Sequence, residues 1–487
     1  MNRFGGAMAT IEKMPEKISI PYNIIFLLPG PYIYEDRCQT YIKKGSFFSY
    51  REPIEELYAA SYLQSLGMTC HIIHAGAENL NELNILKRIG QLHPHVVVIS
   101  TTYPGYHLDL SYAQKIKHLF PQCMIIARGG QMNFVNRFQI LNQFKSLDII
   151  IRGHTGLMIE QIMSNTNWQD IQGMTFKKNN QVIETENAPY NNIWQVCTYP
   201  NRDLLNQKLY ISPGTGLPMA TIVGNSGCPH QCSYCITPSL SHGLFYERPI
   251  SDILSEIHNC QTQYGIHDFL MYGETFTLKE RWLKALCNQL IMHAPGIRWI
   301  CNGRADTLND SIVKLMKHAG CWGICIGAES ASNATLNRVD KKITQRDIIQ
   351  AVQACHNNKL ITMVYFMIGF PWENKKDINE TIRFARQLKS HLTEFFFPYP
   401  FPGTQLHHLF KNQLAREFHL PSPYPQQTPV YSISNITTPQ LINIRNTARL
   451  KTIQYGKTMW ALIKLIRKPF HYLRLGGKLI LALRSIK

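Results

Sequence analysis

The first 190 residues alternate short apolar runs with stretches of helical periodicity. The runs are rich in Ile and Val at consecutive positions, which is typical of strands covered on both faces of a parallel sheet. They lie at residues 24–28, 69–74, 95–101, 124–128 and 148–152. Amphipathic stretches, such as 54–66 and 113–120, separate them. This alternation predicts a doubly wound, flavodoxin-like α/β domain over residues 21–190, preceded by a disordered head at 1–20.

Two further extended runs, 174–176 and 181–184, flank Asn179-Asn180. Asn tolerates the positive φ angles of a tight turn, so these residues predict a β-hairpin. The chain then becomes rich in Asn, Pro and Tyr and keeps no period. Such a stretch indicates an inter-domain linker, which we expect at residues 191–216.

A second strand–helix series follows the linker. Its apolar runs lie at residues 220–223, 269–271, 299–300, 323–326, 363–368 and 394–397. Helical patterns separate them at residues 252–264, 280–293, 310–319 and 347–359. Six such strands predict a partial (β/α)6 TIM-like barrel over residues 217–410, with its site at the C-terminal strand ends. Residues 411–487 are predicted to form a helical, basic C-terminal extension.

The composition is that of a folded chain with a large core. Of the 487 residues, 45% are hydrophobic and only 17% are charged, whereas globular domains carry about 25% charged residues. A disordered chain needs the opposite balance and is excluded. No window approaches the roughly 20 apolar residues of a spanning helix, and the N-terminal residues do not resemble an export signal. We therefore expect a cytoplasmic protein.

The net charge of +18 is concentrated near the C-terminus. Residues 418–487 contain 11 Lys or Arg and no Asp or Glu. Within 456–468, apolar and basic side chains occupy different faces of a predicted helix. Such a helix can contact a membrane surface, or it can pack on the barrel with a solvated cationic face, and both interpretations stay open. Nucleic acid is an unlikely partner, because no recognisable nucleic-acid-binding module accompanies the charge.

Cysteine supplies the candidate chemistry. Directly after the first strand of the second series comes Gly227-Cys228-Pro229-His230-Gln231-Cys232-Ser233-Tyr234-Cys235. Three thiolates at this C-x3-C-x2-C spacing can wrap one face of a cubane cluster and leave one iron open to a small chelating molecule. The alternative is a zinc site, which would need a fourth protein ligand such as His230 or His242.

The remaining cysteines are expected to be buried free thiols. The total of 13 is odd, and without an export signal a disulfide framework is not indicated. Cys321 and Cys325 are four residues apart on a predicted strand, so we expect both side chains to point to one face of the sheet. We interpret them as two buried barrel cysteines.

At the cysteine motif the chain resembles the radical S-adenosylmethionine (SAM) superfamily, which has this spacing and an aromatic residue before the last cysteine. The resemblance covers about residues 217–409, and later family motifs occur in order at the predicted strand ends. They are Tyr272-Gly273-Glu274, Asn302-Gly303-Arg304-Ala305-Asp306, Gly327-Ala328-Glu329-Ser330, Gly369-Phe370-Pro371-Trp372-Glu373 and residues 398–404.

The resemblance implies a 4Fe–4S cluster on Cys228, Cys232 and Cys235. It also implies that SAM is bound by Tyr234, Gly273, Glu274, Arg304, Glu329 and Ser330. A carboxylate can accept hydrogen bonds from an ammonium group, and a guanidinium can grip a carboxylate with two bonds. Two alternatives stay open: Glu274 could instead cap the next helix, and Arg304 could pair with Asp306.

The N-terminal domain resembles the cobalamin-binding domain of one radical SAM class. The implied cobalamin-binding residues follow three predicted strands and are Ser100, Thr101, Thr102, Gly129, Gly130 and Gly153. Strand ends face the ligand crevice in open α/β sheets, and Gly lets a backbone approach a flat ring closely. The chain has no D-x-H-x-x-G motif, so a histidine ligand to cobalt is not indicated. A plain flavodoxin-like domain is the alternative.

The resemblance therefore implies an enzyme that uses a 4Fe–4S cluster, SAM and cobalamin to methylate an unactivated carbon. One alternative is a radical cyclase or oxidoreductase similar to the anaerobic magnesium-protoporphyrin monomethyl ester cyclases. Others are a radical SAM enzyme without cobalamin and a zinc-stabilised interaction protein. The implied partners are a small-molecule or lipid-like substrate and a reductant such as flavodoxin or ferredoxin.

Overall fold

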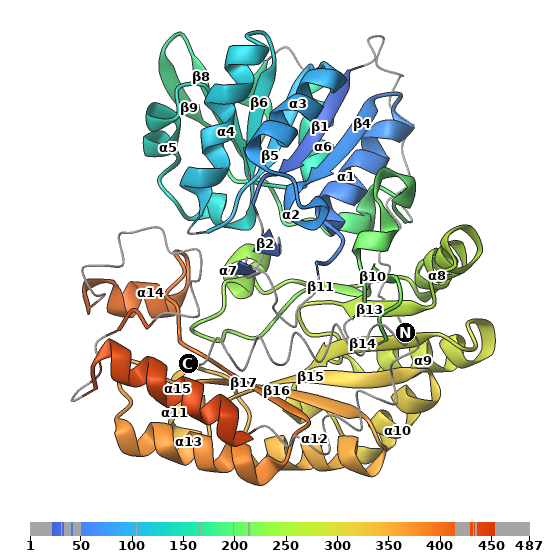
Figure 1. The fold of residues 1–487 in the computed structure, drawn as a ribbon, viewed down its shortest axis with the longest axis vertical. Coiled ribbons are helices and arrows are strands. Elements are labelled where there is room, and N and C mark those ends of the chain that lie inside the picture. Colours follow the sequence, from blue (N-terminus) through green and yellow to red (C-terminus); the bar gives the residue numbers. More distant parts are fainter. Residues whose placement is uncertain are drawn as a thin grey trace, which may run out of the picture.

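The computed structural model describes most of the two predicted strand–helix series. The described residues are 22–30, 32–33, 40–41, 50–103, 105–164, 167–197, 199–212, 215–413, 429–431, 433 and 436–452. The predicted head at 1–20 and the amphipathic tail at 456–487 lie outside them and stay predictions. The described part forms two α/β units, stacked one above the other (Figure 1). None of the described helices is long and apolar enough to cross a membrane.

The N-terminal unit (residues 22–186) is built on one mixed sheet. Its strands lie in the order β4 (Thr69–His74), β1 (Asn23–Leu28), β5 (Val96–Ser100), β6 (Met124–Arg128), β7 (Ile149–Ile151), β8 (Met174–Lys178) and β9 (Gln181–Glu184). The strands from β4 to β7 in this order are parallel. Numbered along the chain they run 2-1-3-4-5, which is the flavodoxin-like order. The predicted doubly wound fold is confirmed.

Helices cover both faces of this sheet. One apolar layer packs against α1 (Ile54–Ser65) and α6 (Thr155–Ser164). The other packs against α3 (Glu82–Leu92), α4 (Tyr106–Leu119) and α5 (Arg137–Gln143). Along β1 the even-numbered apolar residues face the first layer and the odd-numbered ones face the second. This burial on both sides explains why the strands are apolar at consecutive positions.

The predicted hairpin forms one edge of the N-terminal sheet. Strands β8 and β9 pair antiparallel across a two-residue turn, with Lys178 opposite Gln181. The turn residues Asn179 and Asn180 both have positive φ, 52° and 61°. Two positive φ values match the type I′ turn, whose twist suits a hairpin.

The described residues of the segment between the units form short 3-10 turns and one isolated β-bridge, between Ile211 and Pro218. The turns are η3 (Ile193–Gln195), η4 (Arg202–Leu204) and η5 (Gln207–Leu209). Trp194, Arg202 and Tyr210 within it are buried. The predicted linker is therefore packed against its surroundings rather than extended into solvent.

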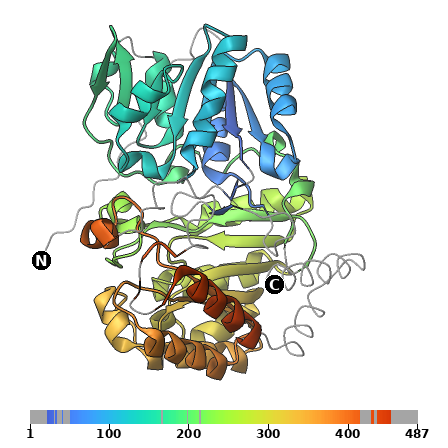
Figure 2. The ribbon, with the colours of Figure 1, turned by 60° about the vertical axis from the view of Figure 1, so that its left-hand side comes forward.

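The second unit contains a parallel sheet whose strands follow one another in chain order. They are β10 (Met219–Val223), β13 (Asp268–Tyr272), β14 (Arg298–Gly303), β15 (Cys321–Glu329), β16 (Ile361–Met367) and β17 (Leu392–Phe396). Helix α7 (Thr237–Ser241) follows the cysteine motif, and the helices of this unit after α7 are α8 (Ile250–Tyr264), α9 (Glu280–His293), α10 (Asp310–His318), α11 (Asn333–Arg338), α12 (Gln345–Asn357), α13 (Lys375–Leu388), α14 (Gln405–Phe410) and α15 (Thr438–Thr452). Helices lie along the outer side of the curved sheet, and α15 lies beside β17 (Figure 2). The predicted partial TIM-like barrel is confirmed.

One prediction about this sheet is wrong. Cys321 packs in the large core between the sheet and its helices, whereas Cys325 packs against the inner cluster that contains Ile300 and Trp322. The register between β14 and β15 shifts at Trp299 and Ile300. A bulge adds one residue and reverses the alternation. The two thiols therefore face opposite sides of the strand, although both are largely buried.

Candidate functional site

The cysteine motif lies in a loop at the C-terminal end of the first barrel strand. After β10 the chain forms β11 (Asn225–Gly227), then the cysteine loop, then α7 (Thr237–Ser241) and β12 (Phe245–Glu247), which pairs with β11. The later motifs also lie at strand ends: Glu274 follows β13, Arg304 follows β14 and Glu329 ends β15. Parallel strands place these ends at one rim of the barrel, where loops form sites.

The backbone and one carboxylate hold the cysteine loop in place. Gly227 has a φ of +82°, and a Cβ there would lie 2.1 Å from the Leu244 carbonyl oxygen, so only glycine fits. The Gly227 N–H donates to Oε2 of Glu274 at 2.9 Å. Glu274 therefore contacts the loop that carries the cysteines. It does not cap α9, which begins at Glu280 after Lys279.

The three cysteines are free thiols. Cys232 is buried, and Cys228 and Cys235 are half-buried. Sγ of Cys228 lies 3.6 Å from the Thr275 hydroxyl, and the Cys235 N–H donates to the Cys232 carbonyl at 3.0 Å. Within the described residues, no three His, Cys, Asp or Glu side chains are grouped to hold a single metal ion. Three thiols in one loop suit a cluster that takes one thiolate at each of several irons.

A buried lysine joins two of the predicted SAM residues. Nζ of Lys341 donates to Oε1 of Glu329 at 2.7 Å and to the Tyr234 hydroxyl at 3.2 Å. Burial lowers the pKa of Lys341, but the charges of Glu329 and Cys232 outweigh it, so the net pKa is raised and the ammonium stays charged. Burial raises the pKa of the Cys232 thiol, and Lys341 acts against that increase. The structure therefore places a permanent positive charge beside the cysteine loop.

Lys341 is absent from the predicted site. In the sequence it belongs to Val339-Asp340-Lys341-Lys342, a charged stretch that is typical of a solvent-exposed loop. Lysine is rarely buried without a partner, and the partner here ends a strand twelve residues earlier. The usable signal is that only the short helix α11 separates this loop from the Gly-Ala-Glu-Ser motif. A Cβ on Gly327 of that motif would lie 2.6 Å from Oε1 of Glu329, so this glycine leaves room for the ion pair.

Two other predicted SAM residues are engaged within the protein. Arg304 bonds both carboxylate oxygens of Asp306, at 3.0 and 3.2 Å, and donates to the Lys341 carbonyl at 2.7 Å. The structure thus shows the ion pair with Asp306, which the sequence offered as the alternative to a SAM contact for Arg304. The Ser330 hydroxyl is fully buried and lies 3.4 Å from the Thr381 hydroxyl of α13. The structure thus groups Tyr234 and Glu329 around Lys341, whereas Ser330 contacts a helix.

The predicted cobalamin residues lie at the C-terminal ends of β5, β6 and β7, the end of the N-terminal sheet that faces the barrel (Figure 1). Their hydroxyl groups already have partners. Ser100 donates to Glu56 at 2.5 Å, Thr101 donates to the Arg128 carbonyl at 2.6 Å, and Thr102 donates to Asp109 at 2.7 Å. These bonds order the strand ends, which leaves the backbone as the surface that a ring could approach.

Of the three predicted glycines of this edge, Gly129 and Gly130 are buried and Gly153 is exposed. Gly129 has a φ of +147°, and a Cβ there would lie 2.6 Å from the Thr101 hydroxyl. A Cβ on Gly153 would lie 2.9 Å from Cβ of Ala188. Gly130 is buried at the start of a 3-10 turn, η1 (Gly130–Asn133). Glycine at position 129 is therefore required by its positive φ and by the close approach of Thr101, at the end of the neighbouring strand β5.

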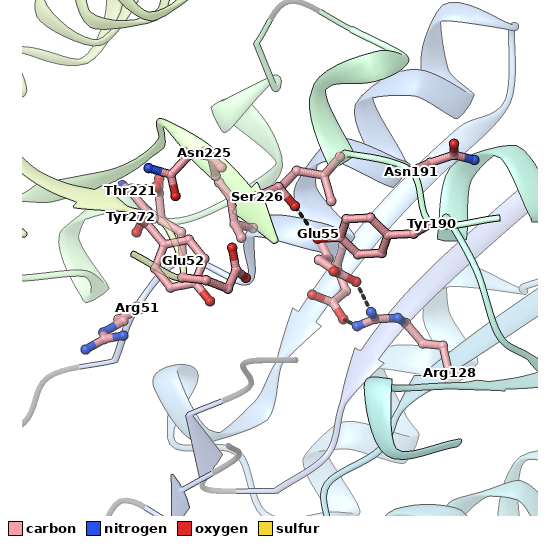
Figure 3. A pocket seen from close by; sticks show the side chains of 15 residues that line it. Arg51, Glu52, Glu55, Arg128, Tyr190, Asn191, Thr221, Asn225, Ser226 and Tyr272 are labelled. Atoms are coloured by element: carbon pink, nitrogen blue, oxygen red, sulfur yellow. Dashed lines mark hydrogen bonds and ion pairs between the residues drawn. The ribbon is translucent and has the colours of Figure 1, made fainter. Parts of the chain in front are cut away.

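A cavity of about 100 Å³, lined mostly by residues with polar or charged side chains, lies between the two units (Figure 3). The N-terminal unit contributes Glu55, Glu56 and Arg128, and Arg128 forms ion pairs with both carboxylates. The barrel unit contributes Ser226, Tyr272 and Glu274, among others. The predicted cobalamin residues do not line the cavity themselves, but Glu56, which accepts a hydrogen bond from Ser100, lines one side of it, and Glu274 beside the cysteine loop lines the other.

The loop after β16 contains a carboxyl group with an unusual pKa. Glu373 is 3% exposed and accepts hydrogen bonds from the N–H groups of Gly369 and Phe370, at 2.7 and 3.0 Å. Burial raises its pKa to about 7, although those two N–H groups oppose the rise. The folded protein therefore prefers the protonated acid, and deprotonation in the fold has a free-energy cost.

We expect the stability of the protein to depend on this group between about pH 4.5 and 7. The folded pKa lies above the unfolded one, so the contribution of Glu373 is present at low pH and is lost as the pH rises through 7. The Glu373→Gln variant cannot ionise. Its stability relative to the wild type should rise by about 3 kcal/mol between pH 4.5 and 8. Denaturant unfolding followed by tryptophan fluorescence measures this, and a difference that does not change with pH contradicts it.

The comparisons with known proteins agree with this site. Residues 222–385 match the model of the Radical SAM superfamily. An uncharacterized methyltransferase of Pyrococcus horikoshii is 25% identical over 80% of this chain and 85% of its own length. An anaerobic magnesium-protoporphyrin IX monomethyl ester cyclase of Cereibacter sphaeroides is 23% identical over 79% of this chain, and the match covers 64% of the cyclase.

A solved structure shares the whole architecture. It is the radical S-adenosylmethionine methyltransferase TsrM from Kitasatospora setae with cobalamin and a [4Fe–4S] cluster bound. The TM-score is 0.65 and the identity is 14%, over 96% of this chain and 99% of TsrM. The match thus includes both units and the segment between them. Residues 222–385 therefore form a radical SAM domain, and the chain as a whole shares the two-unit fold of TsrM.

Proposed function

We propose that this protein is a radical SAM enzyme that methylates an unactivated carbon with the aid of cobalamin. The observation that carries the proposal is that one cavity between the units is lined both by β11, which leads into the cysteine loop, and by Arg128, at the C-terminal end of β6 in the N-terminal sheet. A methyl group that moves between two cofactors needs both of them at the same cleft. The similarity to TsrM and to the methyltransferase of Pyrococcus horikoshii supports this proposal.

The residues around the cysteine loop would bind the cluster and SAM. Cys228, Cys232 and Cys235 would each give one thiolate to the cluster. SAM carries an ammonium and a carboxylate. The Glu274 carboxylate at the loop suits the ammonium, and the buried ammonium of Lys341 suits the carboxylate. We propose that Tyr234, Gly273, Arg304, Glu329 and Ser330 complete this site, with Arg304 and Ser330 acting through their neighbours. When bound, the cluster supplies the electron that cleaves SAM, and cobalamin supplies a transferable methyl group.

The N-terminal sheet edge would hold cobalamin. The hydrogen bonds of Ser100, Thr101 and Thr102 to the protein fix the strand ends. Gly129, Gly130 and Gly153 then present backbone without side chains at that edge, which a flat ring can approach. Ionised and amide groups in the cavity, such as Glu55 and Asn191, would meet polar substituents of the ring.

Anaerobic purification with cobalamin, iron and sulfide tests the proposal. We expect a brown protein with about four irons per chain. With SAM and a chemical reductant it should form both 5′-deoxyadenosine and S-adenosylhomocysteine. A colourless protein that holds one zinc contradicts the radical assignment.

A second candidate function is radical ring formation. The similarity to the cyclase of Cereibacter sphaeroides, over 79% of this chain, favours it specifically. The products separate the two functions, because only methyl transfer from SAM leaves S-adenosylhomocysteine. Formation of 5′-deoxyadenosine without S-adenosylhomocysteine in the presence of cobalamin favours the cyclase.

We further propose a flavodoxin or ferredoxin as reductant, a small or lipid-like substrate, and contact of the basic tail with membranes. The tail prediction is testable with anionic vesicles that contain phosphatidylserine. The full chain should float with them at low salt, and a chain without residues 456–487 should float less. Neutral vesicles are the control, because attraction of basic residues to anionic lipid is electrostatic. Equal flotation of the two chains contradicts a role for the tail.

A further inference from the structure

The barrel sheet has an open edge at β10. In the described part of the chain, β13 is the only strand that pairs with β10 in this sheet. Backbone groups of alternate residues point to opposite sides of a strand, so Met219, Thr221 and Val223 direct theirs away from β13. Unpaired backbone groups in a buried position cost free energy. The edge therefore needs partners from elsewhere.

Side chains and the linker supply those partners. The Thr221 N–H donates to Oε2 of Glu52 at 2.7 Å, and the Thr221 carbonyl accepts from Nη2 of Arg202 at 2.9 Å. The Met219 N–H donates to the Tyr210 carbonyl of the linker at 2.9 Å. The Val223 carbonyl accepts from Nη1 of Arg248 at 3.0 Å. Carboxylate and guanidinium groups thus occupy the place of a neighbouring strand.

The two groups at Thr221 also bind each other. Nε of Arg202 lies 3.0 Å from Oε1 of Glu52, and Nη2 of Arg202 lies 2.6 Å from Oε1 of Glu256 on α8. Arg248 lies 2.6 Å from the other oxygen of Glu256. All four side chains are completely buried. The network is therefore shielded from bulk solvent, and every member depends on the others for its charge balance.

The network joins three parts of the molecule. Glu52 lies two residues before α1 of the N-terminal unit, Arg202 belongs to the linker, and Glu256 belongs to the barrel unit. Glu52 and Thr221 also line the cavity between the units, shown in Figure 3. Two residues beyond Val223 begins β11, which leads directly into the cysteine loop. A contact from the N-terminal unit thus ends on β10, which leads through β11 into the cysteine loop.

We propose that Glu52 and Arg202 are positioning residues that hold the N-terminal unit in register with the cysteine loop. The inference rests on the proposed function, because the position of the N-terminal unit relative to the cysteine loop matters only if a methyl group crosses the cleft. Cleavage of SAM to 5′-deoxyadenosine needs the barrel unit alone. Transfer of the SAM methyl group to reduced cobalamin needs both units, and it leaves S-adenosylhomocysteine because the electron pair of the broken C–S bond stays on sulfur. Loss of the contact should uncouple the two products.

The experiment compares Glu52→Ala with the wild type, both as full chains. Hydrogen exchange without cofactors should be about tenfold faster for the peptide that covers Met219–Val223, because Thr221 loses its acceptor. Exchange of Asp268–Tyr272 should not change. With SAM, cobalamin and titanium(III) citrate, the ratio of S-adenosylhomocysteine to 5′-deoxyadenosine should fall at least about tenfold, because a misplacement of about 1 Å can cost a hundredfold in rate.

Two further variants control for folding and charge. Glu52→Gln keeps an oxygen for the Thr221 N–H, so its exchange should stay close to wild type even if Glu52→Ala folds poorly. Glu280→Ala removes a half-exposed carboxylate that pairs with Lys284 on α9, and both readouts should stay at wild-type values. Unchanged exchange in Glu52→Ala overturns the edge contact. Faster exchange with an unchanged product ratio overturns the positioning role.

Failure of the proposed function is visible separately. A wild-type protein that forms 5′-deoxyadenosine but no S-adenosylhomocysteine contradicts methyl transfer. Small-angle X-ray scattering then decides the inference, since it reports how the two units are arranged without any cofactor. A larger radius of gyration in Glu52→Ala supports the positioning role, and an unchanged one overturns it.

Discussion

Replacing Cys232 with alanine should abolish the formation of 5′-deoxyadenosine. Cys232 is the middle cysteine of the loop and is the most deeply buried of the three. In the proposed site it gives one of only three protein thiolates to the cluster, so its loss leaves two irons without a protein ligand. The iron content should fall well below the about four per chain expected for the wild type. Iron analysis, the optical spectrum and product chromatography measure these effects on protein reconstituted without oxygen.

The matched control for this variant is Cys287→Ala. Cys287 is a fully buried free thiol of α9 that packs in the core between the barrel sheet and its helices. The Cys287→Ala variant also loses one buried thiol, but it leaves the cysteine loop unchanged, so iron content and SAM cleavage should persist. A Cys232→Ala protein that keeps about four irons and still cleaves SAM would show that this thiol is not a cluster ligand.

The periodicity of the chain was enough to predict both α/β units. Strands that are buried on two faces must be apolar at consecutive positions, and the N-terminal strands follow this rule closely. The hairpin was equally accessible, because Asn179 and Asn180 are the residue types that a type I′ turn accepts. The bulge between β14 and β15 could not be predicted, because one added residue does not change the apolar pattern of the sequence. It moved Cys321 and Cys325 to opposite faces.

The candidate site also contains residues that the sequence identifies and residues that only the fold reveals. The cysteine spacing and the short motifs carry their own chemistry, so those residues could be named from the sequence. The charged residues that support them could not. Glu52 and Arg202 are 150 positions apart, and they look like two ordinary surface charges until folding buries both. Charged residues are seldom buried unless paired, and pairing is a property of the fold. Lys341 was hidden for the same reason.

Replacing Lys341 with methionine should weaken SAM binding by about 10- to 100-fold, because hydrogen bonds to charged groups contribute about 1.5–3 kcal/mol. The Lys341 ammonium is 2.7 Å from Glu329 and is the buried positive charge beside Cys232. Methionine fills a similar volume but cannot hold a carboxylate, and it leaves Glu329 without its partner. We therefore expect both a higher KM for SAM and a lower unfolding free energy. Titration of the reconstituted protein with SAM measures the first, and denaturant unfolding measures the second.

Two comparisons separate binding from stability in this variant. Lys342→Met changes the adjacent lysine, whose side chain is 63% exposed and lies 3.7 Å from Asp340, so neither quantity should change much. Lys341→Arg keeps the charge and the bond to Glu329, and should recover part of the SAM affinity. If Lys341→Met lowers stability while its affinity for SAM equals that of Lys342→Met, then Lys341 serves only to neutralise Glu329. In that case another cation at the rim of the barrel must hold the carboxylate of SAM. The next candidate is Arg304, which is 5% exposed and donates a hydrogen bond to the Lys341 carbonyl.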